Sequence, residues 1–340
     1  MSIRNTLSNW LPERLLTADG SKRRVGIEVE LAGVEAGVMA GLIEEMYGGK
    51  RNQRSRFEID IVDTRFGDFR LELDSSYLKE LAAREAAKVT PPGQLEAITA
   101  DLLARASELV VPWEIVTPPI PFAEARTLCE LVRKLRHEGA LGTRYALQFA
   151  FGLHLNPELP DLETGTIVNY LRAYFCLYDW IAARERIDLA RKLTPYIDHF
   201  RKPYVRLLID PNYRPTREQL IDDYLQHNPT RNRSMDMLPL FAHLDEARVR
   251  SAVDDDRINP RPTFHFRLPN CDIDNPDWNL DNSWQLWLQV ERLSNDEARL
   301  LRFCEAYRQL LDSLIPPLGG NSWLNQVEAL LLEQDESQTS

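Results

Sequence analysis

Strict alternation of apolar and polar residues first occurs at residues 24–32, RVGIEVELA. We predict a strand there, because successive side chains of a strand point to opposite faces. Glu28 and Glu30 would lie side by side on the polar face, about 6.6 Å apart at two residue rises. They would repel each other there unless a cation lay between them. A solvated edge strand is the alternative interpretation of this segment alone.

Further segments repeat this design. They are the two arms of a hairpin predicted around a turn at residues 64–68, and the segments 111–119, 145–156 and 261–269. The polar positions of these strands that carry chemistry are Glu28, Glu30, Glu72, Asp74, Glu114, His154, His265 and Arg267. One apolar and one polar face is typical of an antiparallel sheet covered on one side. We therefore predict an α+β fold, with a curved antiparallel sheet, helices on its outer face and an open polar face.

Helical periodicity and Ala, Leu and Glu content predict helices over most of the remaining chain. Predicted helices cover residues 35–47, 78–88, 94–110, 122–138, 164–184, 187–200, 216–227 and 236–253, and two or three more close the chain near residue 334. Two loops rich in Arg and Pro are predicted at residues 201–215 and 228–235. We expect an N-terminal arm over residues 1–23 anchored by Trp10 and Leu11, a single domain over 24–334 and a frayed tail over 335–340.

Composition limits the kinds of binding partner and the cellular compartment that we expect. The formal net charge of −11 argues against a general nucleic-acid-binding surface, although a local basic groove could hold phosphate. Four widely spaced cysteines without a CxxC pair are typical of free thiols in a reducing compartment. No run of 18 apolar residues and no signal peptide are found, so we expect a cytoplasmic protein without a membrane contact. The aromatic helix at 164–184 could be core or interface, so an oligomer stays possible.

Convergence of the carboxylates on one open face would require cations. Each neighbouring pair at about 4 Å costs on the order of 4 kcal/mol at an effective dielectric near 20. Carboxylate oxygens with at most two imidazoles and no cysteine favour Mg²⁺ or Mn²⁺, with zinc less well supported. Each element alone has a simpler interpretation: ExE is common in strands, and a lone histidine at a strand end is more often structural than a ligand. The hypothesis of a metal site therefore depends on these carboxylates and imidazoles occurring together.

Four segments, taken in order, resemble a known group of enzymes. They are GIEVE at 26–30, EIVTPP at 114–119, GLHLN at 152–156 and TFHFRLP at 263–269. Together they resemble the carboxylate–amine ligases of the glutamine synthetase and γ-glutamylcysteine synthetase fold, and most closely the amidoligase family. The resemblance covers the strands from about residue 24 to 270 and leaves the long intervening stretches unmatched. It implies a sheet like that of the glutamine synthetase catalytic domain.

The resemblance also implies a set of metal ligands. In such enzymes the two glutamates of ExE bind different ions, which assigns Glu28 to one ion and Glu30 to another. Glu114 would join Glu30, and His154 would join Glu28. Asp74, in LDSS, is a further expected ligand or substrate contact, with a weaker match.

The last matching strand departs from the family pattern. That strand normally reads Glu-x-Arg, with Glu as a metal ligand and Arg at the transferred phosphate, whereas this chain has His265 and Arg267. Imidazole can also ligate a divalent ion, so the site could persist with one negative charge fewer. An impaired or repurposed enzyme is the alternative.

The activity implied by the resemblance is ATP-dependent amide or isopeptide formation through an acyl phosphate, with two or three Mg²⁺ or Mn²⁺ ions. The substrates would be a small-molecule or peptide carboxylate and an amine. Glu28, Glu114 and Arg267 would be the catalytic residues, and His265 would share the ion of Glu28 and His154. The nucleotide contacts would be Arg267, Arg231, Arg233 and Asn156, although a solvated loop is the simpler interpretation of Arg231 and Arg233. Two other classes stay open: a non-catalytic member that binds a peptide or partner, and a metal-dependent hydrolase.

Overall fold

The computed structural model describes residues 10–73, 112–143, 151–187, 199–313 and 322–337. The chain divides into two compact units. The sheet unit comprises Val25–Leu155 and Asn270–Leu280, and the helical unit comprises Met1–Arg24, Asn156–Pro269 and Asp281–Ser340. The fold is α+β, as predicted. The expectation of a single domain over residues 24–334 stays a prediction.

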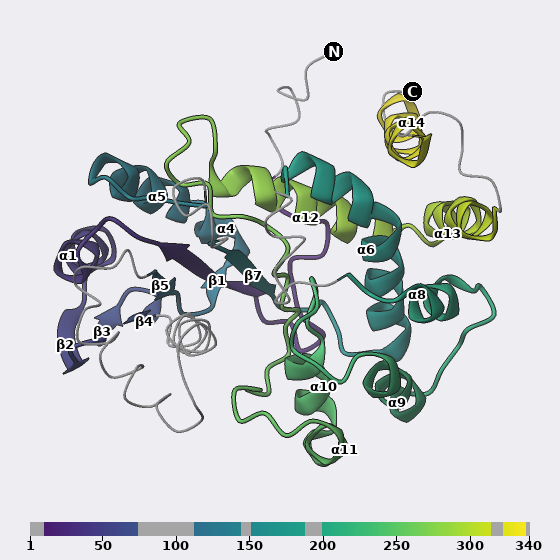
Figure 1. The fold of residues 1–340 in the computed structure, drawn as a ribbon, viewed down its shortest axis with the longest axis horizontal. Coiled ribbons are helices and arrows are strands. Elements are labelled where there is room, and N and C mark those ends of the chain that lie inside the picture. Colours follow the sequence, from purple (N-terminus) through teal and green to yellow (C-terminus); the bar gives the residue numbers. More distant parts are fainter. Residues whose placement is uncertain (1–9, 74–111, 144–150, 188–198, 314–321, 338–340) are drawn as a thin grey trace, which may run out of the picture. The chain divides into compact units, whose positions relative to one another are not determined.

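An open antiparallel sheet is the main element of the sheet unit (Figure 1). Among the described residues the strand order is β2-β3-β4-β5-β1-β6, and β7 also pairs with β1. The strands are β1 (Arg24–Leu31), β2 (Lys50–Ser55), β3 (Glu58–Thr64), β4 (Gly67–Leu73), β5 (Trp113–Val116), β6 (Ile120–Pro121) and β7 (Leu153–Pro157). Burial of one face explains the alternation of β1, because its apolar row Val25, Ile27, Val29 and Leu31 is at most 5% exposed.

Strand β2 was not predicted from the sequence. Its residues, KRNQRS, include no apolar side chain and are exposed throughout. It pairs with β3 through the backbone and forms the edge of the sheet. Charged side chains are a common protection of an edge strand against pairing with another chain. Hydrophobic periodicity therefore gives no signal for such a strand.

Two helices, rather than the single one predicted at residues 122–138, follow β6. They are α4 (Phe122–Ala125) and α5 (Leu128–His137). The break lies at Thr127, whose amide and hydroxyl both donate to the carbonyl of Glu124, at 3.0 and 2.8 Å. These contacts tighten the backbone to three-residue hydrogen bonds and interrupt the α-helical pattern. Helix α1 (Ala36–Tyr47) packs against β3 and α5, and its bounds agree with the prediction.

The helical unit contains α6, which contacts α8, α13 and α14 (Figure 1). Its described helices are α6 (Thr164–Arg184), α8 (Lys202–Ile209), α9 (Arg217–His227), α10 (Leu238–Leu244), α11 (Glu246–Ala252), α12 (Leu280–Asn295, whose first residue belongs to the sheet unit), α13 (Glu297–Asp312) and α14 (Ser322–Ser337). The predicted helices at 78–88 and 94–110, and most of that at 187–200, lie outside the described residues.

Two predictions in this unit were wrong. The predicted loop at 201–215 contains helix α8, with Pro203 in its first turn, where the missing amide hydrogen is of no consequence. The predicted helix at 236–253 is divided into α10 and α11 at Asp245. The Asp245 carboxylate accepts a hydrogen bond from the amide of Arg248 at 3.0 Å and caps the new helix.

The segment at residues 261–269 is extended but forms isolated bridges instead of a regular strand. Thr263 bridges to Glu158 on one side, and Phe266 bridges to Met235 on the other. Phe264, Phe266 and Leu268 are buried, as predicted. His265, expected on an open face, is only 3% exposed because residues 234–236 pair along it.

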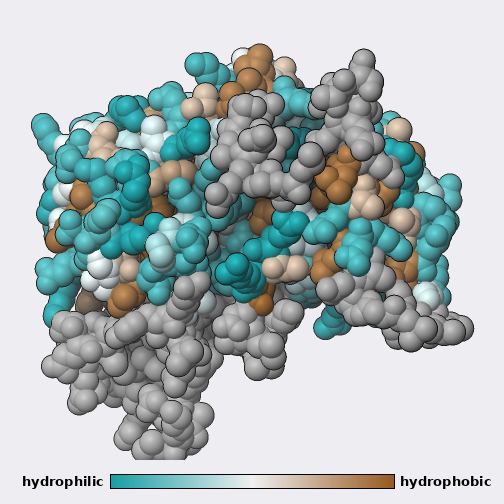
Figure 2. All heavy atoms as spheres, turned by 90° about the horizontal axis from the view of Figure 1, so that it is seen from above, coloured by the Kyte–Doolittle hydropathy of each residue, from teal (hydrophilic) through white to brown (hydrophobic). Residues whose placement is uncertain are grey.

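Trp10 anchors the start of the described chain within the helical unit. It is 6% exposed and stacks on Trp284, whose indole nitrogen donates to the Trp10 carbonyl at 2.7 Å. Leu11, the other expected anchor, is only half-buried. Figure 2 shows hydrophilic residues over much of the face in view, with hydrophobic residues in small groups. Among the described residues, no helix combines the length and apolar character needed to cross a membrane.

Candidate metal site

Strand register in the sheet unit aligns four glutamates in one row. Glu58 on β3 is opposite Glu72 on β4, Glu72 is opposite Glu114 on β5, and Glu114 is opposite Glu30 on β1. Side chains directly opposite each other on one face of a sheet interact, and like charges there are destabilising. We call these four residues the glutamate row. Two of its members, Glu30 and Glu114, are predicted site residues.

His154, on β7, lies among the carboxylates that the sequence singled out. Its Nδ1 is 2.8 Å from Glu28 Oε2 and 4.0 Å from Glu114 Oε1. Its Nε2 is 3.7 Å from Glu30 Oε1. The imidazole is 7% exposed, and the three carboxylate side chains are 13–18% exposed. The structure therefore brings Glu28, Glu30, Glu114 and His154 together in a largely buried group.

Gly152 provides the space that this group occupies. Its amide donates to Glu30 Oε2 at 2.6 Å, which fixes one carboxylate oxygen. A Cβ atom at this position would lie 2.7 Å from His154 Nε2 and 3.4 Å from Glu30 Oε1. A side chain there would therefore overlap the imidazole.

Glu72 was expected on the open polar face, but neither it nor Glu58 was among the residues predicted to form the site. Burial raises the pKa of Glu72; Arg70 opposes this effect, and the charges of Glu58 and Glu28 add to it. A hydrogen bond with the Glu114 side chain has the opposite, smaller effect and lowers the pKa of Glu72. The alternation of β4 placed Glu72 on the polar face, but its alignment with Glu114 depends on a register that only the structure gives.

Glu58, at the outer end of the row, lies beside arginines. Its Oε1 is 3.6 Å from Arg70 Nε and 4.0 Å from Arg54 Nε. Asp60 is close to the same two guanidinium groups. The arginines therefore balance this end of the row, and the end at Glu30 and Glu114 is the part suited to a cation.

The donor set fits a divalent metal ion. Glu30, Glu114 and His154 each offer an atom within 4.8 Å of the others. Ligand atoms that surround one hard divalent cation lie at most about 4–5 Å apart, since each is about 2.0–2.6 Å from the ion. Carboxylate oxygens with one imidazole are suitable for Mg²⁺ or Mn²⁺. A cation there would also offset the repulsion within the glutamate row.

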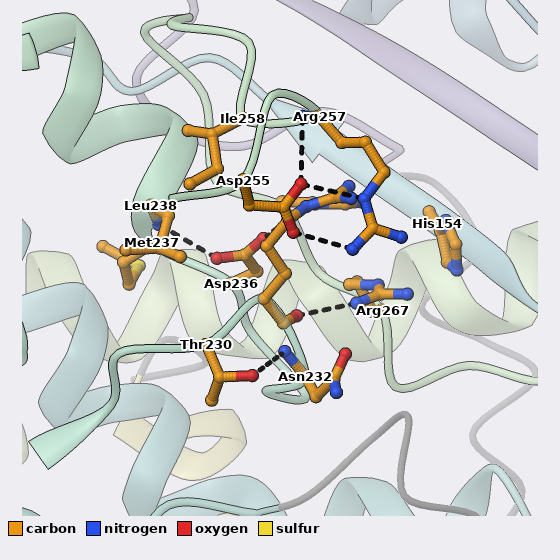
Figure 3. Close-up of polar contacts among 12 residues, drawn as sticks. His154, Thr230, Asn232, Asp236, Met237, Leu238, Asp255, Arg257, Ile258 and Arg267 are labelled. Atoms are coloured by element: carbon orange, nitrogen blue, oxygen red, sulfur yellow. Dashed lines mark hydrogen bonds and ion pairs between the residues drawn. The ribbon is translucent and has the colours of Figure 1, made fainter. Parts of the chain in front are cut away.

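The remaining predicted site residues belong to the helical unit, apart from Asp74, which lies outside the described residues. Arg267 Nη1 donates to the backbone carbonyl of Arg231 at 2.7 Å (Figure 3). Burial lowers the pKa of the Arg231 guanidinium; Asp236 opposes this effect, and the positive charge of Arg267 adds to it. The charges of Arg231 and Arg267 therefore interact, and the carboxylate of Asp236 offsets part of this positive charge.

Arg233 and Asn156 make contacts with their own unit. Arg233 is 5% exposed, and its Nε donates to Asn228 Oδ1 at 2.9 Å. Asn156 is also 5% exposed, and its Oδ1 accepts from Arg261 Nη2 at 3.3 Å. Neither contact was anticipated. Their expected roles as nucleotide contacts stay predictions.

A buried group of carboxylates and one imidazole on an antiparallel sheet defines a candidate hard-metal site. Comparison with known proteins identifies the family: the family model described as "Putative amidoligase enzyme" matches residues 21–289. The chain therefore belongs to this family, which confirms the resemblance and indicates a ligase-type enzyme. No curated protein and no solved structure matches the chain. The specific likeness to the glutamine synthetase fold stays a prediction.

Proposed function

We propose that the protein is an ATP-dependent carboxylate–amine ligase. A substrate carboxylate oxygen attacks the γ-phosphorus of ATP, and ADP leaves. An amine nitrogen then attacks the acyl carbon, the phosphate leaves and the nitrogen loses a proton, which gives an amide or isopeptide bond. Membership of the amidoligase family supports this class of reaction. The observation that carries the proposal is the group formed by Glu28, Glu30, Glu114 and His154.

The carboxylates would hold divalent ions in two pairs. Glu28 would bind one ion with His154, and Glu30 and Glu114 would bind another. The distance of 2.8 Å from His154 Nδ1 to Glu28 Oε2 supports the first pair, and the alignment of Glu30 with Glu114 on neighbouring strands supports the second. Nε2 of His154, 3.7 Å from Glu30 Oε1, would lie beside the second ion. When bound, Mg²⁺ or Mn²⁺ would neutralise phosphate charge and polarise the transferring phosphoryl group. His265 as a further ligand is carried over from the resemblance.

Arginines of the helical unit would bind anionic parts of the substrates. Arg267 would offset charge on the phosphoryl oxygens, and Arg231 would assist it. Their mutual repulsion and the partial burial of Arg231 support an anionic ligand. Positioning and electrostatic stabilisation account for most catalysis of phosphoryl transfer, so these residues would act without covalent chemistry.

The test is a metal-dependent turnover screen. ADP release and amide formation are measured together with amino acids, polyamines and peptides, in Mg²⁺ or Mn²⁺. Glu28→Gln is expected to lower both by at least about a hundredfold, because it removes a charged ligand but keeps the side-chain shape. Glu44→Gln, on the surface of α1, is the matched control and should retain activity.

Three results would overturn the proposal. Full activity of Glu28→Gln would exclude its role as a metal ligand. Nucleotide binding without ADP release for any substrate pair would indicate a non-catalytic binding protein. Product formation without ATP would indicate a metal-dependent hydrolase.

A further inference from the structure

We infer that Asp236 is a positioning residue that holds His265 in the tautomer with hydrogen on Nδ1, leaving the Nε2 lone pair available to a ligand. This inference rests on the proposed function, in which His265 supplies a metal ligand. Both residues belong to the helical unit, and nothing in the sequence singled out Asp236.

Asp236 is a carboxylate without solvent contact. Its exposed fraction is 0%. Its Oδ1 accepts a hydrogen bond from the amide of Leu238 at 3.0 Å, at the start of α10 (Figure 3). Its Oδ2 is buried and accepts no hydrogen bond from the part of the chain that the structure describes. A buried charged oxygen without a donor costs several kcal/mol, so this oxygen requires a nearby donor.

Two nitrogen atoms lie just beyond hydrogen-bond distance of Oδ2. Nδ1 of His265 is 3.6 Å away, and Nε of Arg231 is 3.8 Å away. A movement of less than about 1 Å would bring either nitrogen to the usual hydrogen-bond distance. The imidazole is the nearer of the two, and the His265 side chain is itself only 4% exposed.

The backbone holds Asp236 beside His265. The amide of Asp236 donates to the carbonyl of His265 at 2.9 Å, and the amide of Arg267 donates to the carbonyl of Ser234 at 2.9 Å. Met235 and Phe266 form the antiparallel bridge between these two contacts. Two extended segments are therefore fixed side by side, and only a small side-chain rotation separates the two groups.

Donation from Nδ1 to a carboxylate has a defined chemical consequence. A neutral imidazole carries one hydrogen, so a hydrogen on Nδ1 leaves Nε2 as the acceptor or metal ligand. A carboxylate behind a ligating histidine also raises the basicity of the imidazole. In this chain His265 replaces a glutamate of the family pattern. Asp236 would supply a negative charge beside Nδ1, the imidazole nitrogen that does not bind the ligand.

The substitution Asp236→Asn gives an opposite prediction for the tautomer. The amide of Leu238 needs an acceptor, so the asparagine oxygen is expected to keep the Oδ1 position. The NH₂ group would then face His265 and donate to Nδ1, and the hydrogen of the imidazole would move to Nε2. The variant therefore should reverse the tautomer instead of only weakening a contact.

The experiment is ¹⁵N NMR of the full-length, metal-free protein labelled in its six histidines. Long-range ¹H–¹⁵N correlations report the tautomer, and His265→Gln identifies the signals of His265. We expect hydrogen on Nδ1 in the wild type and on Nε2 in Asp236→Asn. Asp245→Asn, a change at a helix cap of the same unit, is the matched control and should leave these signals unchanged.

Hydrogen on Nε2 in the wild type would overturn the inference, even if Asp236→Asn fails to fold. An unchanged tautomer in a folded Asp236→Asn would also overturn it and would assign Asp236 to Arg231. Titration with Mn²⁺ by calorimetry adds a second readout, with an expected loss of about 10- to 100-fold in affinity at the His265 ion. The tautomer is measured without metal, ATP or amine, so its outcome is independent of whether the ligase proposal holds.

Discussion

The substitution Gly152→Ala tests the site with a single methyl group. The added Cβ would lie 2.7 Å from His154 Nε2, 3.2 Å from His154 Cδ2 and 3.4 Å from Glu30 Oε1. Optimal contacts between non-bonded heavy atoms are about 3.5–4.0 Å. The imidazole must therefore move by about 1 Å.

The expected effects on stability and on function differ in size. The nearest atoms belong to the ends of side chains and not to the backbone, so the fold can accommodate the methyl group. We expect a loss of about 1–3 kcal/mol in the free energy of unfolding, as is typical of overpacking. A displacement of about 1 Å in a site can lower its function by about a hundredfold. The metal site should therefore be lost while the protein stays folded.

The assay is Mn²⁺ binding by calorimetry, with urea unfolding measured on the same samples. Gly165→Ala is the matched control, because a Cβ there meets nothing within 4 Å. It lies in the first turn of α6 and is expected to stabilise the protein by about 0.4–1 kcal/mol without changing Mn²⁺ affinity. Wild-type Mn²⁺ affinity in Gly152→Ala would refute the placement of the ion beside His154.

Three further predictions concern charge. Glu291→Gln leaves the buried Arg23 guanidinium without its carboxylate and should lower the free energy of unfolding in urea by about 3–5 kcal/mol. The double variant with Arg23→Met and Glu291→Leu should lower it by less than the sum of the two single changes. Burial and the charge of Arg233 lower the pKa of His199 from 6.5 to about 3. As the pH drops from about 6.5 towards 3, the histidine is protonated in the unfolded chain before it is protonated in the folded protein, so the free energy of unfolding falls. His199→Phe should flatten this part of the plot of stability against pH. Glu30→Gln removes a like charge opposite Glu114, so it should raise the melting temperature of the metal-free protein and abolish any gain from Mn²⁺.

The sequence predicted those elements whose apolar residues face a core. Strand β1 and helix α6 lie where the apolar pattern indicated. Strand β2 was not predicted, because an exposed edge strand needs no apolar residue. Helix α8 was not predicted, because Pro203 and the neighbouring arginines are typical of a loop. Proline is nevertheless well tolerated in the first turn of a helix.

The residue types of the site could be predicted from the sequence, but most of their spatial arrangement could not. Alternation placed Glu28, Glu30 and His154 on polar faces, and the structure brings them together. The alignment of Glu72 with Glu114 depends on the register of β4 and β5, which are far apart in the chain. The burial of Asp236 arises from pairing between residues 234–236 and the segment that contains His265, and no local pattern encodes such a contact.

The most direct test of the metal site is anomalous diffraction from a crystal grown with Mn²⁺. We expect a manganese peak between the carboxylates of Glu30 and Glu114, within about 2.0–2.6 Å of their oxygens, with His154 beside it. If a crystal grown in a saturating concentration of Mn²⁺ shows no peak at these two carboxylates, they do not bind a metal ion.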